Sequence, residues 1–180
     1  GPSRKAAQLE GSKKFMKDFL SRHGIPTAIY ESFSHLESAI KYLKQLSIPI
    51  VIKADGLAAG KGVTVAQTYT EAEKAVRACL EERSFGEAGN KVVIEEFLQG
   101  EEASFIVLTD GKTVLPLASS QDHKTRDDQD KGPNTGGMGA YSPAPVITTE
   151  IHKKILDQVI MPTIKGLAKE GITYCGFLYA

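Results

Sequence analysis

The segment 49–65, PIVIKADGLAAGKGVTV, combines glycines and lysines at a spacing that suits phosphate binding. An apolar run ends at Lys53, a stretch with three glycines follows, and a β-rich run resumes at Val63. Glycine lets backbone N–H groups approach an anion closely, and lysine supplies positive charge. The segment therefore predicts a β-hairpin that folds over the phosphates of a nucleotide. An ordinary glycine-rich turn is the alternative.

Two familiar nucleotide-binding motifs do not match this segment. A P-loop has the form GxxxxGK[ST] and leads into a helix. Here Gly56 and Gly60 are separated by three residues, and Gly62 follows Lys61. The GxGxxG fingerprint of dinucleotide-binding folds is absent as well. A hairpin lid over phosphates remains the favoured interpretation.

A second candidate site follows the short apolar strand expected at 92–97, VVIEEF. The extended backbone at Glu95 and Glu96 offers N–H and C=O groups to the edge of adenine, and Phe97 and Leu98 offer apolar walls. Glu102 is a candidate acceptor for ribose hydroxyls. The alternative is that these glutamates form a solvated acidic patch.

A third candidate is the polar, glycine-rich segment 121–145, in which hydrophobic periodicity disappears. We expect a long loop there, and a long loop in a compact domain is usually functional or disordered. Backbone N–H groups, short polar side chains and nearby positive charge suit a phosphorylated sugar. The candidate residues are Asp122, His123, Lys124, Asn134, Thr135, Gly136, Gly137 and Met138.

Composition narrows the classes of function. The chain has 180 residues, a formal net charge of zero and 24% charged residues, so no basic surface indicates nucleic acid or anionic lipid as a partner. Cys79 and Cys175 are far apart, which favours neither a disulfide framework nor a zinc site. No apolar run approaches the roughly 20 residues that a membrane span needs. We expect a cytoplasmic globular protein, and the sequence does not indicate its oligomeric state.

The pattern of elements favours an α+β fold in which helices cover mainly antiparallel strands. Helices are expected to begin near Ser12, Ser34 and Thr70, with a last long helix from Thr148 or Thr149 that Pro162 kinks. Strands are expected at 27–33, 50–53, 63–65, 92–97, 103–108, 113–117 and 173–180, with Asp110-Gly111 as a hairpin turn.

Three parts are expected along the chain. Residues 1–26 form a helical lead-in, 27–98 a small lobe with the glycine-rich phosphate loop, and 99–180 part of a second lobe with the substrate loop. The sequence stops within an apolar strand at Ala180, which suggests a fragment of a longer protein.

Four motifs in order carry a resemblance: VIKADGLAAGKGV, EEFLxGEEAS, QDHK and GPNTGGMGAYSPAP. Together they resemble the glycinamide ribonucleotide synthetase (phosphoribosylamine–glycine ligase) family of the ATP-grasp superfamily. The resemblance covers essentially the whole chain. It implies an ATP-grasp fold, with a small glycine-loop lobe and part of a larger antiparallel-sheet lobe, truncated at the C-terminal end. It also implies ATP-dependent joining of glycine to 5-phosphoribosylamine through a glycyl phosphate, giving glycinamide ribonucleotide, ADP and phosphate in de novo purine biosynthesis.

The resemblance also implies roles for individual residues. Lys13 and Lys53 match the lysines that contact nucleotide phosphates, and Glu102 matches the ribose-binding acid. The QDHK and PNTGGMG segments match the part of the site that faces phosphoribosylamine. The phosphate-covering loop corresponds to Ala58, Ala59, Gly60, Lys61, Gly62 and Val63, and the adenine hinge to Glu95, Glu96, Phe97 and Leu98.

The family uses Mg²⁺ or Mn²⁺, held by a glutamate and an asparagine that should lie downstream of Ala180. No metal ligand is therefore expected in this chain, and no catalytic residue is assigned. We expect the chain alone to be inactive. Two alternatives remain, a non-catalytic ATP-binding module and another ATP-grasp carboxylate–amine ligase. A glutamate and an asparagine flanking a strand-end phenylalanine, further along the reading frame, would discriminate between ligase and module.

Overall fold

The computed structural model describes residues 1–58, 62–129 and 131–180, which form two compact units. The amino-terminal unit is Ala7–Gln99, and the carboxyl-terminal unit is Gly100–Ala180 together with Gly1–Ala6. Each unit combines helices with antiparallel strands, in agreement with the expected α+β class. The three-part division at residues 26 and 98 stays a prediction.

The amino-terminal unit is built on one four-stranded antiparallel sheet. The strands in sheet order are β1 (Tyr30–Phe33), β4 (Val92–Glu96), β2 (Ile50–Ala54) and β3 (Val63–Ala66). Successive side chains of a strand point to opposite faces. In β2, Ile50, Ile52 and Ala54 therefore share one face, and Val51 and Lys53 share the other.

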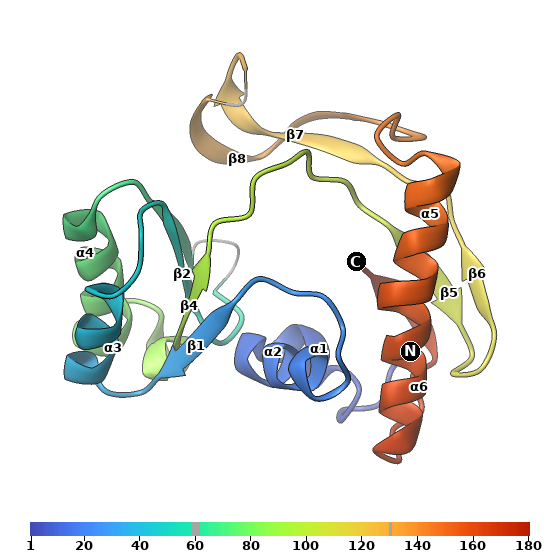
Figure 1. Cartoon of the computed structure of the whole chain (residues 1–180), viewed down its shortest axis with the longest axis horizontal. Helices are drawn as coiled ribbons and strands as arrows, with labels where there is room; N and C mark the ends of the chain where they lie inside the picture. Colours follow the sequence, from blue (N-terminus) through green and yellow to red (C-terminus); the bar gives the residue numbers. More distant parts are fainter. Residues whose placement is uncertain (59–61, 130) are drawn as a thin grey trace. The chain divides into compact units, whose positions relative to one another are not determined.

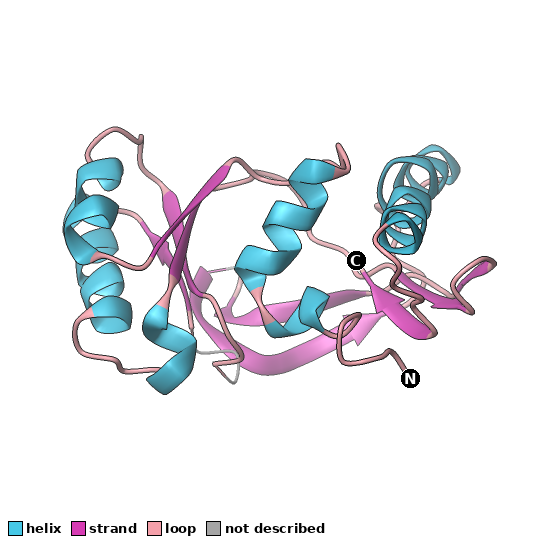
Figure 2. Ribbon diagram, turned by 90° about the horizontal axis from the view of Figure 1, so that it is seen from below, coloured by secondary structure: helices cyan, strands magenta, loops and turns pink. Residues whose placement is uncertain are grey.

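Helices cover both faces of this sheet (Figures 1 and 2). On one face α3 (Leu36–Leu43) and α4 (Tyr69–Leu80) complete the hydrophobic core, while α1 (Gln8–Gly11) and α2 (Lys13–Arg22) lie against the other. The 3₁₀ turn η1 (Gly86–Asn90) precedes β4. The buried core residues are Ala39, Leu43, Ile50, Ile52, Ala54, Ala66, Ala72, Val76, Cys79, Val92 and Ile94. The apolar half of each strand thus faces α3 and α4, which leaves the Lys53 face for polar groups.

The start of α2 is tied to the end of β2. As expected, Ser12 caps the helix, and its hydroxyl accepts a hydrogen bond from the N–H of Phe15. The same hydroxyl and the N–H of Lys14 donate to the carboxylate of Asp55, at 2.9 and 2.7 Å. The first turn of α2 is therefore held in a defined position beside the residue that follows β2.

Helix α4 starts two residues earlier than expected. Thr68 is its N-cap and accepts from the N–H of Glu71, whose carboxylate accepts from the N–H of Gln67. The sequence contains the T-x-x-E capping pattern twice, at Thr68 and again at Thr70. Local sequence cannot choose between two overlapping caps, and the packing of α4 on the sheet selects the first.

The carboxyl-terminal unit contains a three-stranded antiparallel sheet and a long helix. Its strands in sheet order are β6 (Val114–Pro116), β5 (Ile106–Thr109) and β9 (Gly176–Tyr179), and the expected turn at Asp110-Gly111 joins β5 to β6. The helical segments are α5 (Thr149–Ile155), the π-helical η2 (Leu156–Ile160) and α6 (Met161–Lys169). The π-helical turn ends two residues before Pro162. Because proline lacks an N–H, it cannot make the regular helical bond at that position, whereas the expected kink stays a prediction.

The expectation of an aperiodic loop over 121–145 is wrong for most of that segment. β7 (Gln121–Asp127) and β8 (Lys131–Tyr141) pair as a long antiparallel ribbon with two register shifts. Its side chains are mostly exposed or half-buried, so no apolar alternation marks the strands in the sequence. Backbone pairing alone makes this ribbon, and hydrophobic periodicity cannot detect it.

The two cysteines differ in environment. Both are free, Cys79 buried within α4 and Cys175 exposed. Burial raises the pKa of the Cys79 thiol, which keeps it protonated and unreactive. Within the described residues, no helix has the length and apolar character that crossing a membrane requires.

Strand β4 is an inner strand of the sheet and contributes fully buried side chains to the core of the amino-terminal unit. Ile94 is fully buried, whereas Ile29 in the same unit is 70% exposed. We expect Ile94→Ala to lower the free energy of unfolding by about 2–5 kcal/mol, and Ile29→Ala to change it by less than about 0.5 kcal/mol. Denaturant unfolding followed by circular dichroism measures both. Equal losses in the two variants would contradict the assignment of the core.

Candidate functional site

A buried carboxylate lies between two lysines on the polar face of the amino-terminal sheet. Glu95 of β4 faces Val51 in the register, two residues before Lys53 on the same face of β2. The Nζ of Lys53 is 2.7 Å from Oε1 of Glu95, and the Nζ of Lys17 from α2 is 2.6 Å from Oε2. The side chains of Lys17 and Glu95 are 3% and 4% exposed, and that of Lys53 is 27% exposed. Of the two cations, only Lys53 is accessible to a ligand.

Lys17 is fully engaged. Besides Glu95, its ammonium donates to the hydroxyl of Thr27 at 2.8 Å and to the carbonyl of Ala28 at 3.3 Å, which uses all three of its donors. It also lies 5.5 Å from the centre of the Tyr30 ring. The sequence did not single out Lys17. Its one signal was the i, i+4 spacing from Lys13, which puts both lysines on one face of a helix.

Tyr30 closes the other side of this cluster. It pairs with Glu95 across β1 and β4, and its hydroxyl donates to Asp18 at 2.8 Å. Burial, followed by the bond to Asp18, raises the pKa of Tyr30 to about 12. The hydroxyl therefore stays protonated at neutral pH and continues to donate its hydrogen bond to Asp18.

Lys13 is the first residue of α2 and lies beside the same cluster. Its ammonium donates to the carbonyl of Gly56 at 3.0 Å, and its backbone N–H donates to the carbonyl of Asp55. Burial and then the positive charge of Lys53 lower the pKa of Lys13, an effect that nearby carboxylates partly offset. The two ammonium groups are thus close enough to repel each other, and a bound anion would relieve that repulsion.

Two glycines next to these lysines are required by close contacts. A Cβ on Gly56 would lie 2.8 Å from the Cβ of Ala88, and a Cβ on Gly62 would lie 2.6 Å from the Cβ of Ala58. The carbonyl of Gly62 accepts from the N–H of Ala54 at 2.7 Å, which closes the base of the β2–β3 hairpin. Only glycine fits at either position.

The predicted phosphate-covering loop is described at its two ends. Ala58 is half-buried before the tip, and Val63 is exposed on β3 directly opposite Lys53. Ala59, Gly60 and Lys61 lie outside the described residues. The hairpin thus begins and ends beside the exposed lysine.

The predicted hinge residues differ in what they contact. Glu96 is tied to the residue before β1, because its carboxylate accepts from the N–H of Ile29 at 2.9 Å. Pairing of β4 with β2 ends at Glu96, and Phe97 and Leu98 continue beyond it with exposed side chains. Glu95 points inward. Its Oε1 is close to Lys53 but in poor hydrogen-bond geometry, and among the described residues it has no hydrogen-bond donor.

In the carboxyl-terminal unit, Lys124 of β7 lies close to two carboxylates. It forms an ion pair with Glu102 and lies 3.9 Å from Asp122. The hydrogen bond from Lys124 to Glu102 raises the pKa of this lysine. The structure therefore joins the acid predicted for ribose to a lysine predicted for the second substrate, a connection that the sequence did not indicate.

The remaining predicted residues lie along the β7–β8 ribbon. The rings of His123 and Tyr141 are 5.4 Å apart, and Tyr141 is a neighbour that the sequence did not single out. The Thr135 hydroxyl donates to the carbonyl of Lys124 at 3.0 Å and accepts from the N–H of Gly137 at 3.1 Å. Gly136 and Met138 are exposed next to this turn of hydrogen bonds. The backbone of Asn134 pairs with Thr125, and its side chain lies outside the described part of the structure.

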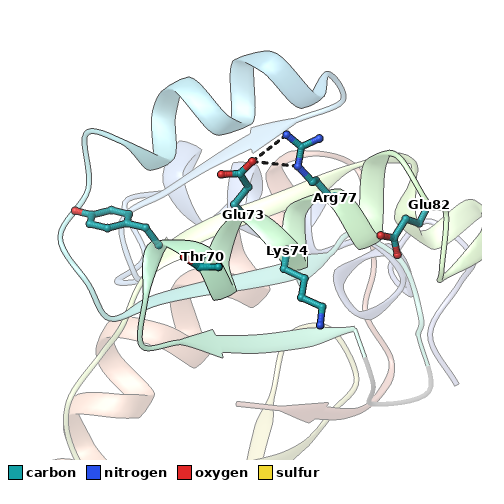
Figure 3. A pocket seen from close by; sticks show the side chains of 6 residues that line it. Thr70, Glu73, Lys74, Arg77 and Glu82 are labelled. Carbon is teal, nitrogen blue, oxygen red and sulfur yellow. Dashed lines mark hydrogen bonds and ion pairs between the residues drawn. The ribbon is translucent and has the colours of Figure 1, made fainter.

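A hollow of about 330 Å³ lies elsewhere, along α4 (Figure 3). It is lined by Tyr69, Thr70, Glu73, Lys74, Arg77 and Glu82. Glu73 and Arg77 form an ion pair at 2.9 Å across one helical turn. None of the binding-site residues predicted from the sequence lines this hollow. Among the described residues, no group of three or more histidine, cysteine or acidic side chains converges to hold a metal ion.

Comparison with known proteins shows that the chain has an ATP-grasp fold. The family described as "Phosphoribosylglycinamide synthetase, ATP-grasp (A) domain" matches residues 11–180. The chain belongs to this family, which is the one that its four motifs resemble.

Similar proteins support this conclusion and show that the chain is shorter than they are. The phosphoribosylamine–glycine ligase of Pseudomonas syringae pv. tomato is 66% identical over all 180 residues, which span 42% of its length. The crystal structure of the Thermotoga maritima phosphoribosylamine–glycine ligase has a TM-score of 0.88 and 38% identity, covering 99% of this chain and 45% of that one. A biotin carboxylase from Campylobacter jejuni, at 20% identity and a TM-score of 0.74 over 99% of this chain and 39% of its own, shares the fold alone.

The closeness of two ammonium groups predicts a titration shift. The midpoint for Lys13 should lie below the ordinary value of 10.5, because burial and the charge of Lys53 disfavour its charged form. Lys53→Met removes the like charge and should raise the midpoint, whereas Lys41→Met, on the exposed face of α3, should leave it unchanged. NMR titration of the side-chain carbons of Lys13 measures this. No response to Lys53→Met would contradict the proximity of the two ammonium groups.

Proposed function

We propose that the amino-terminal unit binds ATP, with the phosphates held by Lys13 and Lys53. The observation that carries this proposal is the placement of two lysines around the start of the hairpin. The ammonium of Lys13 donates to the carbonyl of Gly56 at 3.0 Å, Lys53 lies near the end of β2 with its side chain partly exposed, and the charge of Lys53 lowers the pKa of Lys13. Two cations held close together favour a polyanion that contacts both. Asp55 is already engaged by the cap of α2, and Glu95 is shared with Lys17. The triphosphate of a nucleotide supplies the anionic oxygens that this site lacks.

The β2–β3 hairpin, residues 58–63, covers the bound phosphates. Gly62 closes the base of the hairpin beside Lys53, and the hairpin contributes backbone N–H groups to the anion. Adenine binds at the end of β4, where the backbone of Phe97 and Leu98 continues beyond the last paired residue.

We further propose that the longer protein containing this chain is a phosphoribosylamine–glycine ligase of the cytoplasm. It joins glycine to 5-phosphoribosylamine with ATP, giving glycinamide ribonucleotide, ADP and phosphate. The glycine carboxylate takes up the γ-phosphoryl group, and the amine then displaces phosphate from the glycyl phosphate. Family membership and the 66% identity to a ligase of that name support this.

In this reaction the residues of the chain bind, orient and exclude water. Lys13 and Lys53 neutralise charge that moves onto the leaving phosphates, which is the main demand of phosphoryl transfer. The closed hairpin keeps water from the reactive glycyl phosphate. Mg²⁺ or Mn²⁺ lowers the charge of the phosphates when it is bound. We expect its ligands to be a glutamate and an asparagine of the longer protein, and we expect this chain alone not to turn over.

In the carboxyl-terminal unit, the β7–β8 ribbon binds 5-phosphoribosylamine. Lys124 supplies positive charge and His123 a side-chain donor, and the Thr135 hydroxyl holds the glycine-rich turn beside them. Asp122, Asn134, Gly136 and Met138 complete this binding surface, and Glu102 accepts from ribose hydroxyls of ATP. A non-catalytic ATP-binding module is the second candidate, since nucleotide contacts and metal ligands are separable along the sequence.

The nucleotide role of Lys53 is testable on this chain. Lys53→Ala removes a charge-assisted contact to phosphate and should weaken ATP binding by about 1.5–3 kcal/mol. Lys41→Ala, on an exposed position of α3, removes the same side chain elsewhere and should have no measurable effect. Isothermal titration calorimetry with ATP compares the two. Equal affinities of both variants would refute the phosphate site.

The substrate role of the ribbon needs the longer protein. His123→Ala should raise the KM for phosphoribosylamine about tenfold or more, as the loss of one hydrogen bond to a charged group does, and leave the KM values for ATP and glycine nearly unchanged. His35→Ala, at an exposed position in the amino-terminal unit, is the control. Steady-state kinetics with each substrate varied in turn separates the three values. A change confined to the KM for ATP would mean that the ribbon serves the nucleotide.

A further inference from the structure

Glu95 has two cationic partners of different accessibility. Lys53 reaches solvent and the hairpin, whereas Lys17 is 3% exposed and its ammonium is surrounded by oxygen acceptors. A ligand can therefore compete for Lys53 but cannot reach Lys17. The carboxylate itself is 4% exposed, so water does not replace a partner that leaves.

When a phosphate draws Lys53 away, Glu95 loses one of its two cationic partners. A buried carboxylate without a counter-ion is strongly unfavourable, because its charge is no longer solvated or paired. If Lys53 were the sole partner of Glu95, each phosphate contact would leave that charge uncompensated. The ion pair to Lys17 at Oε2 persists in either case, because it uses the other oxygen.

We propose that Lys17 is a positioning residue, the permanent counter-ion of Glu95 that leaves Lys53 free to exchange the carboxylate for a nucleotide phosphate. The proposal rests on the proposed ATP site and adds a residue that contacts neither nucleotide nor substrate. Its effect is specific to phosphate. Loss of Lys17 should make Glu95 retain Lys53 and so weaken ligands in proportion to their phosphate contacts.

Contacts on several elements keep Lys17 in place. Thr27 and Ala28 accept its other two hydrogen bonds, and Tyr30 of β1 presents its ring to the ammonium. The helix that carries Lys17 is anchored at its first turn to Asp55. Lys17 is thus immobilised at both ends, as a permanent counter-ion needs to be.

The test compares ADP with adenosine on the 180-residue chain. Lys17→Met should weaken ADP about tenfold or more, the loss of roughly one charge-assisted contact, while adenosine binding changes less than about twofold. Lys14→Met removes a neighbouring, more exposed lysine of α2 and should change neither. NMR titration measures both ligands, and circular dichroism checks folding. A purely structural role would weaken ADP and adenosine alike, and that result would overturn the proposal, as would an unchanged ADP affinity.

A second variant covers the case in which Lys17→Met does not fold. Lys17→Met/Glu95→Gln removes both buried charges, so Lys53 no longer has a competing carboxylate. The ratio of ADP to adenosine affinity should return to at least the wild-type value, and a ratio that stays low would overturn the proposal. Lys53→Met separates the two hypotheses. If it lowers ADP affinity while Lys17→Met does not, only this inference fails, and if it leaves ADP affinity unchanged, the ATP site itself is wrong.

Discussion

The amino-terminal unit depends on one buried carboxylate. Glu95 lies where β4, β2 and α2 meet. Each neighbouring element supplies a cation that pairs with its carboxylate, Lys53 from β2 and Lys17 from α2. Desolvating a carboxylate is costly unless cations and hydrogen bonds replace water. The pairing therefore demands that α2 lie against the polar face of the sheet, and the Asp55 cap sets where the helix begins. Of the two cations that serve Glu95, Lys53 lies beside the hairpin and is the more exposed, and this is why we propose an anion site there.

One sheet thus separates two kinds of chemistry. Its face toward α3 and α4 is fully apolar and supplies the stability of the unit, while its other face holds the charged cluster. Because side chains alternate between the two faces of a strand, β2 (Ile50–Ala54) contributes to the apolar core and to the charged cluster at once. Stability on one face offsets the unfavourable burial of charge on the other. Gly56 and Gly62 then let the backbone come close enough to complete the edge of the site.

Several features of the sequence were sufficient for prediction. Glycine and lysine spacing indicated the hairpin, because few residue types can take these positions. The α+β class and the cap of α2 at Ser12 followed from periodicity and capping chemistry, and family membership agreed with the motifs. The start of α4 was misplaced by two residues because two capping patterns overlap. The β7–β8 ribbon was missed because its polar and glycine residues show no apolar alternation.

The sequence by itself determined which residues are chemically able to bind phosphate, since glycine freedom and lysine charge are properties of residue type. It also determined the apolar periodicity from which the core forms. Only the tertiary structure decided which charges meet. Lys17 appears in the sequence as one more lysine of an amphipathic helix, and Glu95 and Glu96 appear equivalent. Folding buries Glu95 beside two lysines and ties Glu96 to Ile29, because neighbouring residues of a strand point to opposite faces and long-range packing determines what each face contacts.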